Sequence, residues 1–160
     1  MDYLGIDTGI RNQAVDSDGN IYTFEKMWKN DKEKNLILYS ISNAILNKAK
    51  TSNRGLAVEK VFRLDRKQAA PWKGNNRYRT ILYYVVKQAR LQKIPVVYVD
   101  HNNTSKECSS CGNLKDNFRY ADEFKCAKCK IKLHADINAA KNMRKRALKM
   151  APAYGFPPPK

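Results

Sequence analysis

The residues with the clearest chemistry are the chain's four cysteines, which form two CxxC pairs, Cys108/Cys111 and Cys126/Cys129, separated by fourteen residues. This spacing lets two short turns close over one tetrahedral ion and is a specific signal for zinc. Four thiolates and no fifth donor predict a closed structural site, because a catalytic zinc keeps one position open for water or substrate. An iron–sulfur cluster, two disulfides or four unrelated core cysteines are the alternatives.

The surroundings of the cysteines favour the metal. Nothing at the N-terminus resembles a signal peptide, so we expect a reducing, cytoplasmic environment in which thiols stay free. The segment between the pairs is polar, and too few apolar side chains remain for a core of its own. The metal must therefore supply the folding energy of this segment.

Three carboxylates form a second candidate site. Asp7 ends a predicted strand over residues 2–7, Glu59 ends an apolar strand over residues 56–59, and Asp136 opens a helix. If the two strands are neighbours, the three side chains share one site, and no cation close in sequence neutralises their repulsion. Two Mg²⁺ or Mn²⁺ ions about 4 Å apart would neutralise it and support in-line phosphoryl displacement. Taken singly, each acid also fits a turn, an ion pair or a helix start.

The charge balance predicts a polyanionic partner. Lys and Arg number 31 against 15 acidic residues, a net charge of +16, and each neutralised phosphate releases counterions. A membrane is not expected, because no apolar run approaches the roughly 20 residues of a spanning helix. Cations alternate with aromatic residues over positions 62–79, which suits a nucleic-acid surface or, equally, a solvated loop. The candidate contacts are Arg63, Arg66, Lys67, Trp72, Lys73, Arg77 and Arg79.

The elements that position these residues follow the order βββ, α, β, α, β, ribbon, α. Three short strands over residues 2–7, 12–15 and 21–24 predict an antiparallel meander, with a turn at Ser17 to Asn20 and a positive φ at Gly19. Helices are predicted over residues 31–50, 78–93 and 136–150, the first capped by Asn30 or Asp31, and strands over 56–59 and 95–100. The apolar stripe of the first helix is expected at Leu36, Ile37, Tyr39, Ile41, Ala44, Ile45 and Ala49, and that of the second at Ile81, Leu82, Val85, Val86, Ala89 and Leu91.

This order predicts an α/β core over residues 1–103 and 134–150, an inserted zinc ribbon over 104–133 and a flexible proline-rich tail over 151–160. Three stretches resemble a known family: GIDTGIRNQAV at 5–15, LAVEKVF at 56–62, and the cysteine segment followed by HADINAAKN at 134–142. They are similar to the three RuvC-type motifs and zinc ribbon of transposon-encoded TnpB-type nucleases and their type V CRISPR relatives. The resemblance implies an RNase H-like (RuvC-like) mixed sheet in which Asp7, Glu59 and Asp136 bind two Mg²⁺ for DNA cleavage.

The chain also departs from the family. It begins one residue before the first strand, so we expect it to lack the N-terminal portion that binds guide RNA. Lys130 stands where glycine is common, and Ala135 where an arginine often precedes the aspartate. RuvC-type resolvases carry a further acid one turn into the last helix, where this chain has Ala139 and Ala140.

The resulting hypothesis is a metal-dependent DNA endonuclease acting on single-stranded, branched or locally opened DNA. The alternatives are a RuvC-type junction resolvase, a nucleic-acid-binding relative that no longer cuts, and a domain that needs RNA or a partner chain. A homodimer stays open, because no dimer face is readable from the sequence.

Overall fold

The computed structural model describes residues 1–9, 14–23, 30–60 and 77–150, with the side chains of residues 31 and 77–80 left out. The proline-rich tail predicted for residues 151–160 therefore lies outside the described residues. Among the described helices, none has the length and hydropathy needed to cross a bilayer.

The core is a five-stranded mixed sheet in the order β3-β2-β1-β4-β5. Its strands are β1 (Asp2–Asp7), β2 (Ala14–Asp16), β3 (Ile21–Tyr22), β4 (Arg54–Glu59) and β5 (Val96–Val99). The first three strands pair antiparallel, whereas β1, β4 and β5 run parallel. The prediction of an α/β chain in which the first and fourth strands are neighbours is confirmed.

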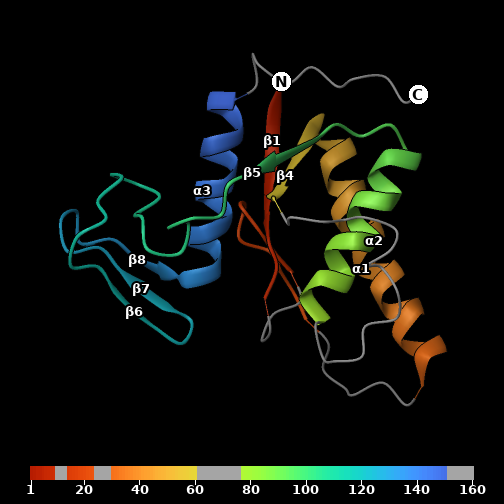
Figure 1. Ribbon diagram of the computed structural model, residues 1–160, viewed down its shortest axis with the longest axis horizontal. Helices are drawn as coiled ribbons and strands as arrows, with labels where there is room; N and C mark the ends of the chain where they lie inside the picture. The colour runs from red at the N-terminus through yellow and green to blue at the C-terminus, as the bar shows by residue number, and fades with distance from the viewer. Residues whose placement is uncertain (10–13, 24–29, 61–76, 151–160) are drawn as a thin grey trace.

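Helices cover both faces of this sheet (Figure 1). Helices α1 (Asp31–Thr51) and α2 (Arg77–Leu91) pack on one face, and α3 (Ala135–Met150) packs on the other. Side chains alternate along β1, so Leu4 contributes to the core beneath α1 and α2, while Tyr3 packs with Met143 of α3. Burial on both faces explains why β1 and β4 read as continuous apolar runs.

Helix α1 begins as the sequence predicts and buries Ile41, Ile45 and Ala49 of the predicted stripe, with Ile37 partly buried beside them. The Asn30 side chain accepts a hydrogen bond from the backbone N–H of Glu33 at 2.9 Å, which is an N-cap. The buried positions are Leu38, Ile41, Ser42, Ile45, Leu46 and Ala49. The predicted burial of Leu36, Tyr39 and Ala44 is wrong, because the helix is rotated so that these residues face solvent. Leu91 of α2 is likewise exposed, since the helix ends there.

The predicted turn between β2 and β3 is confirmed. Gly19 has a φ of +99°, a conformation that side chains with a Cβ rarely adopt. Asp16 is fully buried beneath this turn and accepts hydrogen bonds from Asn20, Tyr22 and Lys48. The Lys48 ion pair, with an N–O distance of 2.9 Å, ties the hairpin to α1.

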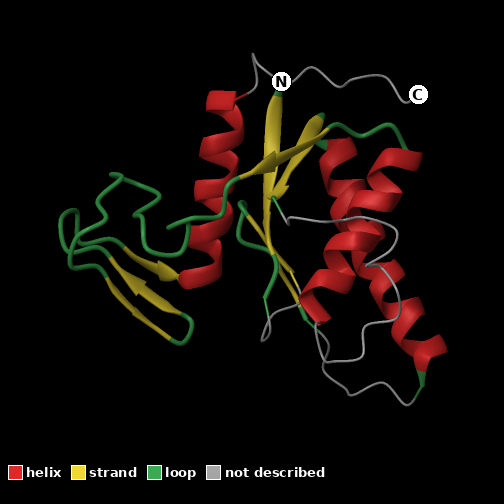
Figure 2. Ribbon diagram, viewed as in Figure 1, coloured by secondary structure: helices red, strands yellow, loops and turns green. Residues whose placement is uncertain are grey.

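A separate three-stranded antiparallel sheet is formed by β6 (Phe118–Tyr120), β7 (Glu123–Lys125) and β8 (Lys132–His134), and Cys126 and Cys129 lie between β7 and β8. We call residues 104–133, which include all four cysteines, the cysteine ribbon. Figure 2 shows it beyond α3, away from α1 and α2. Strand β8 continues into α3 without an intervening loop, so the orientation of the ribbon is linked to that of the helix.

Helix α3 lies unusually close to β1, and Gly5 makes this possible. A Cβ atom on Gly5 would overlap the carbonyl oxygen of Ala140 and lie 2.8 Å from the backbone nitrogen of Arg144. Both are backbone atoms of the helix, so no side chain can rotate away. At the start of the same strand, Asp2 accepts two hydrogen bonds from the Arg144 guanidinium, at 3.0 and 2.7 Å.

We therefore expect Gly5→Ala to destabilise the fold strongly, by about 3 kcal/mol or more, because α3 must move away from the sheet. The free energy of unfolding in urea measures this effect. Gly112→Ala is the matched control, since a Cβ there would meet nothing closer than 3.9 Å and only its φ of +76° is unfavourable. Equal losses in the two variants would contradict the close-packing explanation.

Candidate active site and metal centre

Asp7 and Glu59 lie at the same edge of the sheet. Strands β1 and β4 pair in parallel register up to Ile6 opposite Val58, so the next position on each strand carries one of the two acids. The Thr8 hydroxyl donates a hydrogen bond to Oε1 of Glu59 at 3.3 Å, across the two strand ends. Parallel pairing thus brings together residues that are 52 positions apart.

Asp136 reaches this edge from the first turn of α3. Its charge acts on Asp7: burial, together with the negative charges of Asp136 and then Glu59, raises the pKa of Asp7 to about 8. Arg119 works in the opposite direction and lowers this pKa. The three carboxylates therefore lie within electrostatic range of one another, and ionising all of them without a cation is unfavourable.

The carboxylate oxygens of the trio are not as tightly clustered as single-ion ligands would be. Among the described residues, two groups have ligand atoms that all lie within 4.8 Å: the four cysteines, and Asp122 with His134 and Asp136. Asp136 thus also faces Asp122 of the cysteine ribbon and His134 at the end of β8. A wider spread suits two ions, because ions about 3.5–4 Å apart need ligands around both of them.

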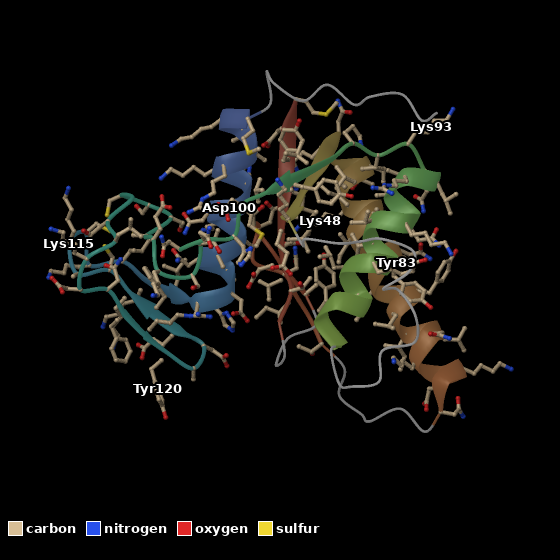
Figure 3. All side chains as sticks on the ribbon, viewed as in Figure 1. Lys48, Tyr83, Lys93, Asp100, Lys115 and Tyr120 are labelled. Atoms are coloured by element: carbon tan, nitrogen blue, oxygen red, sulfur yellow. The ribbon has the colours of Figure 1, made fainter. Side chains whose placement is uncertain are left out.

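Arg119 is the functional candidate that sequence reasoning missed. Its Nη2 lies 3.7 Å from Oδ1 of Asp136, so a cation from β6 stands beside the acidic trio. Its neighbour on the strand, Tyr120, is 75% exposed and points away from the molecule (Figure 3). Alternation along the strand places Arg119 on the opposite face. No signal in the sequence predicts this contact, because it depends on how the ribbon folds back against α3.

The four cysteines converge on one point. The Sγ atoms of Cys108 and Cys129 are 3.7 Å apart, and those of Cys111 and Cys126 are 3.5 Å apart. A metal–sulfur bond of about 2.3 Å in a tetrahedron places sulfur atoms about 3.8 Å apart. The distances fit one tetrahedral ion, and we find no disulfide among these cysteines. The cluster can therefore bind a structural metal.

The surroundings act in opposite directions on two of the cysteines, and burial raises the pKa of the Cys108 thiol to about 12. Burial opposes ionisation of Cys126, but the backbone N–H groups of Cys129 and Lys128 and the neighbouring thiols lower its pKa to about 6. The buried core of the ribbon is small and consists of Cys108, Phe124, Cys126 and Ala135. Two of these four residues are cysteines of the cluster, so little of this core remains apolar without them.

Lys130, which departs from the family pattern, is in the left-handed conformation with a φ of 63°. That conformation explains why glycine suits this position. The candidate nucleic-acid contacts Arg63, Arg66, Lys67, Trp72 and Lys73 lie outside the described residues. Arg77 and Arg79 lie in the first turn of α2, but their side chains are outside the description.

Comparisons with known proteins agree with the motifs. Residues 78–143 match the sequence family described as "Cas12f1-like, TNB domain". The CRISPR-associated endodeoxyribonuclease Cas12f1 of an uncultured archaeon is 46% identical over 63 residues, and that of Sulfoacidibacillus thermotolerans is 37% identical over 67 residues. The chain resembles the Cas12f1 group of type V CRISPR effectors. This confirms the family resemblance predicted from the sequence.

A solved structure extends the likeness to most of the fold. The cryo-EM structure of a Cas12f1–sgRNA–target DNA complex aligns with 88% of this chain at a TM-score of 0.61 and 22% identity. This chain covers 49% of that structure's protein chain, and the sequence matches cover 12% and 16% of the two Cas12f1 relatives. The family match includes Asp136 and all four cysteines, whereas Asp7 and Glu59 precede it.

The raised pKa of Asp7 gives a testable pH dependence. Without divalent ions added to the trio, the folded protein holds a proton on Asp7 up to about pH 8, which the unfolded chain releases near pH 4. The folded state binds more protons in this window, so Asp7 lowers the free energy of unfolding as pH rises from 4 to 8. We expect Asp7→Asn to be more stable than the parent above pH 8, by about 2 kcal/mol or more, and similar to it at pH 4.

Urea unfolding of zinc-loaded protein without Mg²⁺ at pH 4.5 and 8.5 measures this difference. Asp18→Asn is the control: hydrogen bonds from Arg54 hold the pKa of that carboxyl well below its usual range. Loss of the Asp18 carboxylate charge should therefore destabilise the protein at neutral pH. Parallel pH profiles of Asp7→Asn and the parent would refute the burial and repulsion described for Asp7.

Proposed function

We propose that the chain is a metal-dependent DNA endonuclease domain with an RNase H-like (RuvC-like) core. The observation that carries the proposal is the electrostatic meeting of Asp7, Glu59 and Asp136, which are 52 and 77 positions apart in the chain. A partly buried set of mutually repelling carboxylates is costly unless cations bind it. Mg²⁺ and Mn²⁺ accept such oxygen ligands and leave room for phosphate oxygens.

Asp7, Glu59 and Asp136 would hold two divalent ions that, when bound, supply the charge for in-line displacement at phosphorus. Asp7 would release its proton on loading, because the ions remove the repulsion that raises its pKa. Thr8 orients Glu59 through its hydrogen bond. Arg119 offers charged donors to a phosphate oxygen on the ribbon side of the site, beside the Asp136 carboxylate.

The relatives support the reaction and the substrate class. Both Cas12f1 proteins are named endodeoxyribonucleases, and the solved Cas12f1 structure is a complex with guide RNA and target DNA. The net charge of +16 favours a phosphodiester partner. We propose DNA that is single-stranded, branched or locally opened as the substrate, with RNA or a partner chain as the source of guidance.

We further propose that the cysteine ribbon is a zinc ribbon inserted into the nuclease core between β5 and α3. The sulfur–sulfur distances of 3.5 and 3.7 Å support one tetrahedral Zn²⁺ held by Cys108, Cys111, Cys126 and Cys129. The core would then comprise residues 1–103 and 134–150. Zinc here is structural, because four thiolates leave no position for substrate.

The nuclease proposal is tested by incubating labelled single strands, duplexes and four-way junctions with Mg²⁺ or Mn²⁺, or with no added divalent ion. We expect Glu59→Gln and Asp136→Asn each to lower the cleavage rate by roughly 100-fold or more, because each removes a charged metal ligand while keeping the side-chain shape. Glu123→Gln, which removes an exposed acid of the ribbon, is the matched control and should cleave normally.

Retention of full activity by Glu59→Gln would exclude the proposed site. DNA binding that is indifferent to Mg²⁺, with no cleavage of any substrate, would instead favour the non-cleaving alternative. Cleavage of four-way junctions alone would favour a resolvase. RNA that co-purifies with the chain and is required for cleavage would identify a guided activity.

The zinc proposal predicts about one zinc per chain and a strong loss of zinc in Cys111→Ser, because serine is a poor zinc ligand. Metal analysis of the purified protein measures both values. Ser110→Ala, at the neighbouring position in the same turn, should retain the zinc. Iron in place of zinc, with visible absorption by the purified protein, would show an iron–sulfur cluster instead.

A further inference from the structure

Two buried asparagines on α3 bond to the backbone of the segment that leads into Cys108. Asn138 and Asn142 are one helical turn apart, with exposed fractions of 0% and 1%. Asp136 lies two residues before Asn138, in the same first turn of the helix. A buried amide keeps its position only while its hydrogen-bond partners keep theirs. The contacts of Asn138 therefore bear directly on the position of Asp136.

Both polar atoms of the Asn138 side chain bond to the peptide groups that flank Cys108. Its Oδ1 accepts a hydrogen bond from the N–H of Ser109 at 2.9 Å, and its Nδ2 donates to the carbonyl of Glu107 at 2.8 Å. Cys108 is thus held from both sides by one side chain of α3. A cysteine ligand and the helix that carries Asp136 are connected by two buried hydrogen bonds.

Asn142 also bonds to the backbone just before Cys108. Its Nδ2 donates to the carbonyls of Glu107 at 2.7 Å and Thr104 at 2.8 Å. Cys108 is itself fully buried, and its Sγ lies 3.7 Å from that of Cys129. A metal held by the cysteines would fix Cys108 and, through it, the partners of both asparagines.

We propose that Asn138 is a positioning residue that couples metal occupancy of the four-cysteine site to the cation affinity of the acidic trio. The inference rests on the proposed function, since it assigns Mg²⁺ to the trio and zinc to the cysteines. Loss of zinc frees Cys108, which removes both partners of Asn138 and leaves a buried amide unpaired in the first turn of α3. The helix start then shifts, and Asp136 no longer faces Asp7 and Glu59.

Coupling of this kind acts in both directions. If zinc strengthens Mg²⁺ binding at the trio, Mg²⁺ must strengthen zinc binding by the same factor, typically about 5–150-fold. Mg²⁺ does not compete for cysteine thiolates, because it takes oxygen ligands. Slower zinc loss in Mg²⁺ would therefore report the connection through the protein. This readout does not require DNA cleavage.

The test follows zinc transfer to a zinc-selective fluorescent chelator, with and without saturating Mg²⁺. In the parent protein we expect Mg²⁺ to raise the zinc affinity at least about fivefold, and to slow zinc release. In Asn138→Ala we expect zinc release to be equally fast with and without Mg²⁺, because the variant lacks the two hydrogen bonds to the peptide groups beside Cys108. A purely structural role would change the rate equally in both and leave the Mg²⁺ effect intact.

Arg146→Ala is the matched control. Arg146 lies two turns after Asn138 and donates hydrogen bonds to the segment between β5 and Cys108. Its partners are the carbonyls of Asp100 at 2.6 Å and Asn102 at 2.8 Å, and the Glu107 carboxylate at 2.9 Å. It does not bond the peptide groups beside Cys108. This variant should lose stability and still show slower zinc release in Mg²⁺.

Asn138→Ser is the second variant in case Asn138→Ala fails to fold, because serine stays polar but is too short to reach both peptide groups. Mn²⁺ binding to the zinc-loaded protein, measured by calorimetry, should weaken at least about fivefold in either variant. The inference is overturned if both keep the Mg²⁺ effect, or if the parent shows none. Normal cleavage that depends on Glu59, together with no Mg²⁺ effect on zinc release, would reject the coupling and leave the nuclease proposal standing.

Discussion

The close packing of α3 against β1 is the constraint on which the rest of this structure depends. The helix backbone approaches the strand at Gly5, where a Cβ would meet the backbone of Ala140. That contact sets the distance between the carboxylates at the strand ends and Asp136 at the helix start. Because β8 runs straight into the same helix, it also sets where the cysteine ribbon sits. One backbone contact therefore positions both candidate metal sites.

The two candidate metal sites differ in the type of their ligand atoms and in how closely these atoms are clustered. The four cysteine sulfur atoms surround one point at distances that fit a single tetrahedral metal ion. Such an ion would stabilise the ribbon, which has few apolar side chains. The acidic trio is more widely spread, and its repulsion with burial keeps Asp7 protonated to about pH 8 in the absence of cations. Asn138 follows Asp136 by two residues, and its side-chain amide is hydrogen-bonded on both sides of Cys108. The ribbon is thus part of the environment of the trio.

Much of the fold followed from local patterns. Four predictions are confirmed, because each depends on adjacent residues or on a long apolar run: strand β1, the Asn30 cap, the turn at Gly19 and the pairing of β1 with β4. The predicted burial of Leu36, Tyr39 and Ala44 in α1 was wrong, because the rotation of the helix on the sheet depends on tertiary packing. The asparagines of HADINAAKN carried a readable signal, because two amides one turn apart on an apolar helix face require buried partners.

The sequence by itself determined the cysteine pairs, the identity of the three acids and the family resemblance, because these depend on residue type and spacing. Only the tertiary structure decided that Arg119 stands 3.7 Å from Asp136, that Asp122 and His134 face the same carboxylate, and that Asn138 joins the ribbon to α3. Each of these contacts requires the ribbon to fold back on the helix. That orientation results from packing at β1 and from the direct junction of β8 with α3, which no local pattern encodes.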